Sequence, residues 1–189
     1  MRDFGNSILG RAVYDATFNE MTKPYSHAMS VTLAAQAAEI IIKARIAQEH
    51  PLLIFENLPT SSAVEGLLGL KDIYEHGRTI AYSDLPDKLW ASVGYRIENI
   101  KLFIDFGKLR NKIVHLAPPS SPELSDETLR FAFTVVDPMI EVFWDDTIVN
   151  YVEVWDDVIV NEGYLKERID KLDIQISKNA ISAIKQAMN

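Results

Sequence analysis

The sequence predicts an all-α protein, a bundle of about five to seven helices, from three observations. Apolar residues recur at three- and four-residue steps along several long stretches, the period of a helix with one buried face. Glycine and proline number only eight each, which is low for a loop-rich β-sandwich. The 189 residues are 48% hydrophobic and 24% charged, as in ordinary globular proteins. A chain of this length can bury roughly 70% of its unfolded surface, so we expect one domain over residues 1–189.

Two strong helix patterns stand in the first third of the chain. We expect a helix over 8–22, ended by Pro24, and a long one from Ser26 to about Gln48. The second is apolar around nearly its whole circumference, which is typical of a buried helix. Shorter helices are predicted over 61–75 and 84–93.

The clearest pattern of the second half runs from near Glu98 to about His115. Its apolar positions are Leu102, Phe103, Phe106, Leu109, Ile113 and Leu116. Ser125 is the expected N-cap of the next helix, which Pro138 should kink. A last helix is predicted from Tyr164 to Met188, and a short strand within 147–160.

Charge is distributed unevenly along the chain. The net charge is −8, so the whole molecule should not coat nucleic acid nonspecifically. Residues 96–118, however, carry five basic and two acidic side chains, and residues 119–189 carry six and fourteen. A basic segment therefore lies within an acidic protein.

Several classes of site are excluded or disfavoured by motifs. The absence of cysteine excludes disulfides, thiolate zinc sites and cysteine nucleophiles. No phosphate loop, dinucleotide fingerprint, His-Glu-x-x-His or Gly-x-Ser-x-Gly motif occurs, so we expect no cofactor and no metal. The acidic set Glu141, Asp145, Asp146, Glu153, Asp156 and Asp157 is better explained as a solvated face or a docking surface than as a cation site. With neither a signal peptide nor a membrane span, a cytoplasmic protein with no membrane partner is expected.

The segment that carries chemistry is 106–119, FGKLRNKIVHLAPP. It places Arg110 and His115 near the end of a helix with four residues between them. Arginine is a permanent cation whose planar fork fits a phosphate, and histidine exchanges protons near neutral pH. Together these two side chains suit cleavage of a phosphodiester.

Helical geometry limits how these two groups can cooperate. Five residues advance about 500°, so the side chains start about 140° apart. Either the last turn unwinds ahead of Pro118, or a second copy of the chain completes the site. A two-fold dimer supplies two of each residue, so that one histidine can act as base and the other as acid.

The run Arg110-Asn111-Lys112-Ile113-Val114-His115 resembles the Arg-x(4–6)-His signature of the HEPN superfamily, including the polar Asn111 after the arginine. The helical setting is similar, and the resemblance covers about 25–150, leaving 151–189 as a C-terminal helical extension. It implies a metal-independent endoribonuclease that works as a homodimer, commonly a toxin or an antiphage defence effector, and leaves a cyclic phosphate.

The resemblance also implies roles for individual residues. Arg110 would stabilise the phosphate, His115 would move protons, and Asn111 would orient the phosphate or hold Arg110. Lys101, Lys108 and Lys112 would steer the RNA backbone. HEPN toxins with a nucleotidyltransferase antitoxin usually have a tyrosine two residues after the histidine, where this chain has Ala117. An antitoxin or regulatory protein is a possible partner, but regulation through that tyrosine is unsupported.

Three alternatives stay open. Arg110 can instead pair with Asp105 or with acidic residues of the last helices, while His115 merely caps its helix. The chain can also be a catalytically inactive HEPN-like binding or scaffold module whose acidic surface docks a partner. A third possibility is a helical protein with a small-molecule pocket lined by Trp90, Tyr95 and Trp144.

Overall fold

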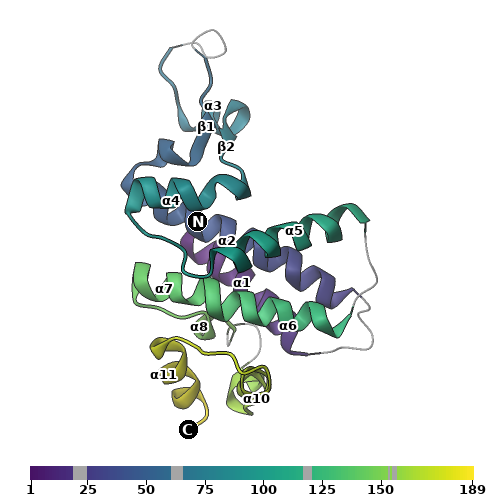
Figure 1. Cartoon of the computed structure of the whole chain (residues 1–189). Helices are drawn as coiled ribbons and strands as arrows, with labels where there is room; N and C mark the ends of the chain where they lie inside the picture. Colours follow the sequence, from purple (N-terminus) through teal and green to yellow (C-terminus); the bar gives the residue numbers. More distant parts are fainter. Residues whose placement is uncertain (19–24, 61–65, 117–120, 153, 155–156) are drawn as a thin grey trace. The chain divides into compact units, whose positions relative to one another are not determined.

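The protein is described by a computed structural model that covers residues 1–18, 25–60, 66–116, 121–152, 154 and 157–189. It is built almost entirely of α-helices, which confirms the all-α fold class (Figure 1). The described chain divides into two compact units, one made of 1–41 with 97–189 and the other of 42–96. No helix among the described residues is long and apolar enough to cross a membrane.

The first unit contains most of the helices. They are α1 (Arg2–Thr17), the first part of α2 (Ser26–Glu49), α5 (Ile100–Leu116), α6 (Pro122–Phe131), the π-helical turn η3 (Ala132–Val136), α7 (Asp137–Trp144), α8 (Val149–Val152), α9 (Val158–Asn161), α10 (Tyr164–Lys171) and α11 (Lys178–Ala187). Helix α2 has nearly the predicted bounds. Helix α1 starts earlier than predicted and already ends at Thr17, with Phe18 extended, while 19–24 lie outside the described residues. It packs on α6 and α8, where the absent side chain of Gly10 leaves room for the backbone of Tyr151.

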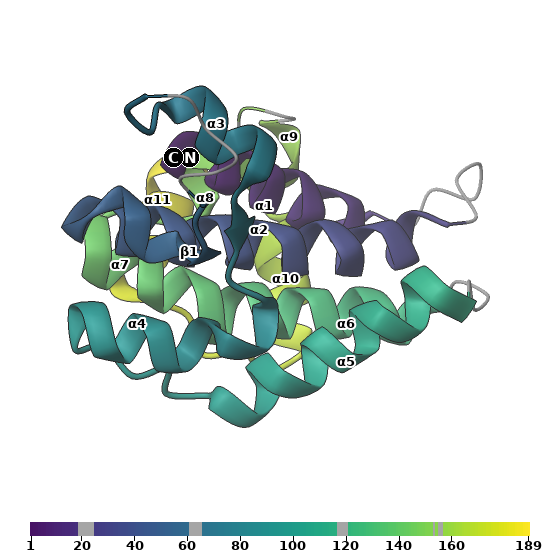
Figure 2. The same ribbon diagram turned by 90° about the horizontal axis from the view of Figure 1, so that it is seen from above.

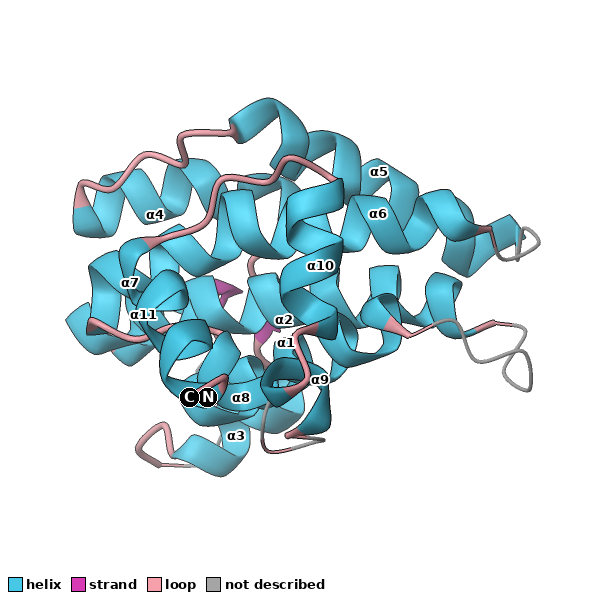
Figure 3. Ribbon diagram, turned by 90° about the horizontal axis from the view of Figure 1, so that it is seen from below, coloured by secondary structure: helices cyan, strands magenta, loops and turns pink. Residues whose placement is uncertain are grey.

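The second unit contains the end of α2, the 3₁₀ helices η1 (Pro51–Ile54) and η2 (Tyr82–Asp84), strands β1 (Phe55–Asn57) and β2 (Arg78–Thr79), and helices α3 (Leu70–His76) and α4 (Leu85–Val93). The two strands pair antiparallel and are drawn in magenta in Figure 3. Helix α4 agrees with the helix predicted over 84–93. The helix predicted over 61–75 begins only at Leu70 in the described residues, and 61–65 lie outside them.

Helix α5, which carries the predicted catalytic motif, is held against α6 by stacked phenylalanines. The rings of Phe106 and Phe131 lie 3.9 Å apart between centroids and are nearly parallel, and Phe103 packs against the same ring. Ile113 continues this buried side toward the end of the helix. Figure 2 shows α5 lying beside α6. Leu116, predicted as the last apolar core position, is instead 75% exposed.

The next helix, α6, starts earlier than expected. Ser125 is not its N-cap, because α6 begins at Pro122 and the Ser125 hydroxyl donates to the carbonyl of Pro122. A kink was expected at Pro138; the structure has a π-helical turn, η3, just before it. Proline has no N–H to donate to the carbonyl of Thr134, and the side chain of Asn99 donates to that carbonyl instead, at 2.9 Å.

Short helices divide the last third of the chain. The single helix predicted from Tyr164 to Met188 is wrong: α10 ends at Lys171, Asp173 adopts a left-handed conformation, and Ser177 caps α11 by accepting from the amide of Ala180. None of the described residues of 147–160 is in a strand, and most are in helices or turns, so the strand predicted there is wrong as far as these residues go. The expected count of five to seven helices is not confirmed.

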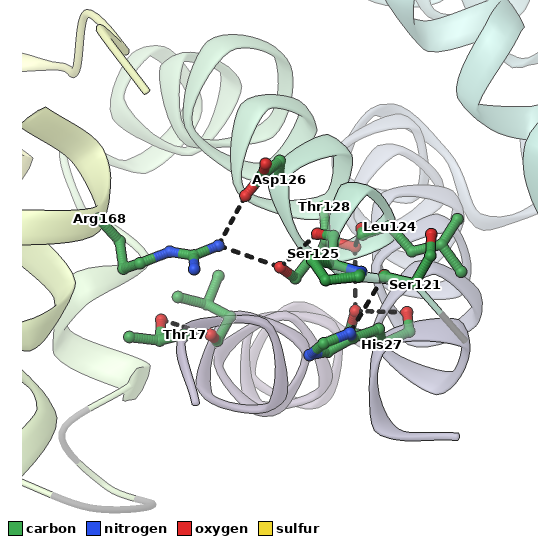
Figure 4. A network of polar contacts seen from close by, with 11 residues as sticks. Thr17, His27, Ser121, Leu124, Ser125, Asp126, Thr128 and Arg168 are labelled. Carbon is green, nitrogen blue, oxygen red and sulfur yellow. Dashed lines mark hydrogen bonds and ion pairs between the residues drawn. The ribbon is translucent and has the colours of Figure 1, made fainter. Parts of the chain in front are cut away.

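Two polar networks fasten these short helices to the rest of the unit. Arg168 on α10 donates to Ser125 and Asp126 on α6, and beside them the Nδ1 of His27 donates to the carbonyl of Ser121 (Figure 4). The second network centres on the buried carboxylate of Asp137 at the start of α7, which accepts from segments on both sides of α8–α10.

Candidate active site

All six residues predicted for the site lie on α5, which stays helical to Leu116. An unwound last turn was one of two ways to bring Arg110 and His115 together. It is wrong as far as Leu116, and Pro118 lies outside the described residues. On the unbroken helix the two side chains leave the axis about 140° apart.

Three lysines and the histidine share one exposed side of α5. Lys101, Lys108, Lys112 and His115, which we call the cationic face, fall within a sector of about 60° on the helix. All four are exposed, and the row extends about 21 Å along the axis at 1.5 Å per residue. Asp105 lies at its edge and accepts from Lys108 at 3.0 Å. The predicted RNA-steering residues are thus aligned with the predicted proton-transfer residue.

Arg110 lies on the other side of the helix, toward α2. Its Nη2 is 3.9 Å from Oε2 of Glu39, and the two side chains are 28% and 27% exposed. The partner in this ion pair is therefore Glu39. It is neither Asp105 nor an acidic residue of the last helices, which were the partners considered from the sequence. Sequence reasoning missed Glu39. The available signal was a carboxylate in the middle of a mostly apolar helix, where a charged group needs a partner; in the sequence alone, Lys43 one turn later was the evident candidate.

Asn111 occupies the sector between the two predicted catalytic residues. It is exposed, and on the helix it is displaced about 40° from His115 and about 100° from Arg110. Its amide is thus placed nearer to the cationic face than to the Arg110–Glu39 pair. A role beside His115 fits this position better than a role in holding Arg110 from within the same copy.

Large apolar side chains are exposed around these groups. On α5 the exposed fractions are 46% for Ile104, 55% for Val114 and 75% for Leu116. On α2, the helix that supplies Glu39, Met29 is 57% exposed. On the helix, Ile104, Val114 and Leu116 leave the axis in different directions, so they are separate exposed apolar positions near the motif.

The acidic residues of the C-terminal third are partly engaged within the protein. Asn179 donates to both Glu141 and Asp145. Burial would raise the pKa of Asp146, but hydrogen bonds from Thr147 and other neighbours, among them Arg2, outweigh it and hold that pKa below its usual value. Glu153 and Asp156 lie outside the described residues, among which no group of three or more acidic or histidine side chains has the arrangement of a metal site.

The tryptophans considered for a small-molecule pocket each contact a guanidinium. Arg96 lies 4.6 Å from the ring of Trp90, and Arg2 lies 5.1 Å from the ring of Trp144. These cation–π contacts stabilise the units in which they occur.

Comparison of the chain with models of known families, with curated proteins and with solved structures finds no match.

Proposed function

We propose that the protein is a metal-independent endoribonuclease of the HEPN type, with Arg110 and His115 as its catalytic residues. The observation that carries the proposal is the arrangement on α5. His115 ends an exposed row of lysines, while Arg110, the phosphate-binding group of the motif, lies on the other side of the helix beside Glu39.

The chemistry requires no cofactor. One His115 removes the proton of a ribose 2′-hydroxyl, and the resulting oxygen attacks the adjacent phosphorus. A bond from phosphorus to the 2′-oxygen forms as the bond to the 5′-oxygen breaks, and a second His115 protonates the leaving 5′-oxygen. Arg110 stabilises the negative charge that develops on the phosphoryl oxygens. The products are a cyclic phosphate and a 5′-hydroxyl.

The site is composed of two copies of the chain. Acid and base must flank one phosphate, and a single copy offers one motif histidine that diverges from its arginine by about 140°. A two-fold contact brings the same surface of both copies together and so supplies two of each group. The exposed Ile104, Val114 and Leu116 provide apolar area for such a contact.

The first test is cleavage of total RNA by purified variants. Arg110→Ala and His115→Ala are each expected to lower the rate by at least about 100-fold, the scale of lost acid–base catalysis. His76→Ala is the matched control, because His76 is also an exposed histidine in the last turn of a helix. Arg78→Ala is the control for the arginine, since Arg78 also pairs with a glutamate. Full activity of either motif variant, or loss of activity in EDTA, contradicts the mechanism.

The second test counts the histidines in one site. Wild-type and His115→Ala chains are refolded together in equal amounts so that dimers form at random. If both copies must supply His115, activity falls to about a quarter, the square of the wild-type fraction. Retention of about three quarters of the activity means that one histidine per dimer suffices, and retention of half means that each copy acts independently. A wild-type dimer that cuts no RNA would favour an inactive scaffold module instead.

A further inference from the structure

A groove in the C-terminal part of the first unit lies between α10, α11 and the segment that joins them. Its volume is about 420 Å³, and five isoleucines contribute to its lining: Ile169, Ile174, Ile176, Ile181 and Ile184. Three of them are nearly fully buried, whereas Ile181 is 41% exposed at the wall. Because the last helix is broken at Asp173, two helices and an extended segment surround this apolar surface.

Charged side chains stand at the rim of the groove. Lys166 and Asp170 form an ion pair one helical turn apart, so their charges cancel locally. Lys185 is exposed, and among the described residues no carboxylate forms an ion pair with it. Residues 164–189 carry five basic and three acidic side chains, in contrast to one and eleven in 119–163. The lining residues themselves include two lysines, Lys166 and Lys185, and one aspartate, Asp170, so the groove combines an apolar interior with a rim of net charge +1.

These properties define a ligand class. At about 30 Å³ per heavy atom, the groove holds roughly 14 heavy atoms. An aliphatic lining without aromatic rings suits a flexible hydrocarbon chain, and a net positive rim suits an anionic head. We infer that this groove binds a free single-chain aliphatic carboxylate of about ten carbons, its chain among the isoleucines and its carboxylate at Lys185. This inference is independent of the proposed nuclease activity.

The probe is sodium decanoate below its micelle concentration, titrated into the full-length protein by calorimetry and followed by amide chemical shifts. Saturable binding with shifts confined to residues 164–187 is expected. Decyltrimethylammonium, which has the same chain and the opposite charge, is expected to bind at least about tenfold more weakly. Absence of saturable decanoate binding, or equal binding of both amphiphiles, overturns the inference.

Charge variants test the position of the head. Lys185→Gln should weaken decanoate binding about threefold to fivefold, as for an exposed ion pair. Asp170→Asn should strengthen it by a similar factor, because Lys166 then loses its internal partner. Lys171→Gln, an exposed lysine outside the lining, is the matched control and should change nothing. Equal effects of the Lys171 and Lys185 variants, or weaker binding by Asp170→Asn, contradict the placement.

A last variant tests the position of the chain. Ile181→Asn introduces a polar group at a partly exposed wall, where the fold tolerates it, and should weaken decanoate binding at least about fivefold. Thermal unfolding of the variant without ligand checks that the fold is retained. Unchanged binding by the folded variant contradicts the inference.

Discussion

Asp137 provides the sharpest test of how the C-terminal helices are attached. The side chain is fully buried. Its Oδ1 accepts from the hydroxyl of Thr147 and the amide of Ile148, both at 2.8 Å, and its Oδ2 accepts from the hydroxyl of Ser177 at 2.6 Å. One carboxylate thus joins the start of α7 to the segment before α8 and to the cap of α11.

The cost of removing this carboxylate follows from its contacts. Hydrogen bonds to a charged group are each worth about 1.5–3 kcal/mol. A variant without the carboxylate also avoids the cost of burying a charge, which reduces the net loss by several kcal/mol. We expect Asp137→Ala to lower the free energy of unfolding by about 3–4 kcal/mol, and Asp137→Asn by about 2 kcal/mol because one acceptor remains. Asp87→Asn, at an exposed position, should change it by less than about 0.5 kcal/mol.

The contribution of Asp137 to stability is expected to change with pH in a definite direction. Burial, opposed by the hydrogen bonds of Ser177, Ile148 and Thr147, raises the pKa of Asp137 above its ordinary value of 3.8. The folded protein therefore holds this proton more tightly than the unfolded chain does. Stability from this group is complete below pH 3.8 and falls as the pH rises through the raised pKa.

Urea unfolding at a series of pH values measures the difference in free energy of unfolding between wild type and Asp137→Asn. The other titrating groups are common to both proteins, so their effects cancel in this difference. The disadvantage of the variant should be largest at low pH and shrink toward neutrality. A disadvantage that grows with pH would refute the reasoning, because the fold would then favour the charged carboxylate.

Two further substitutions test contacts of the first unit. Gly10→Ala would place a Cβ 2.5 Å from the carbonyl oxygen of Tyr151. Urea unfolding should therefore show a free energy of unfolding lower by about 2–4 kcal/mol, whereas the same change at an ordinary helical site would raise it by about 1 kcal/mol. A higher free energy of unfolding would mean that α1 and α8 do not approach closely. Glu39→Gln removes a long, partly exposed ion pair with Arg110 and should cost less than about 1 kcal/mol of stability. If Glu39 positions Arg110, the same variant should cut RNA about tenfold more slowly with unchanged RNA affinity, and an unchanged rate assigns the pair no catalytic role.

The sequence predicted the helices whose local signals agree with their packing. The range from Ser26 to about Gln48 was found because its apolar residues lie around nearly the whole circumference of a helix, and α2 is indeed buried on most sides. On α5 the spacing of Phe103, Phe106 and Ile113 identified the buried side before any partner was known. In both helices the period of the apolar residues and the environment of the helix carry the same information.

The features that were missed depend on tertiary contacts. Nothing local shows that Arg110 faces Glu39, because these residues lie about 70 positions apart and are brought together only by the fold. The break after Lys171 was missed because the apolar residues of the following segment fit a helical pattern, while the cap at Ser177 is also held from outside by Asp137. Sequence periodicity therefore found most of the buried side of α5, although not the exposure of Leu116, and it could not find which polar groups meet.

The unbroken helix allows one more test of whether the proposed nuclease site spans two copies. A spacing of four residues would separate two side chains by about 40° instead of the 140° between Arg110 and His115. Position 114 has that spacing from Arg110, and Val114 is 55% exposed, so the fold should accept a polar ring there. The double variant Val114→His, His115→Ala thus moves the imidazole toward the arginine of its own copy and away from the cationic face.

If two copies share the site, RNA cleavage should stay as low as in His115→Ala, with helicity and oligomeric state unchanged. Recovery of cleavage in the double variant would show that one copy contains a complete site, and the two-copy mechanism would then be wrong.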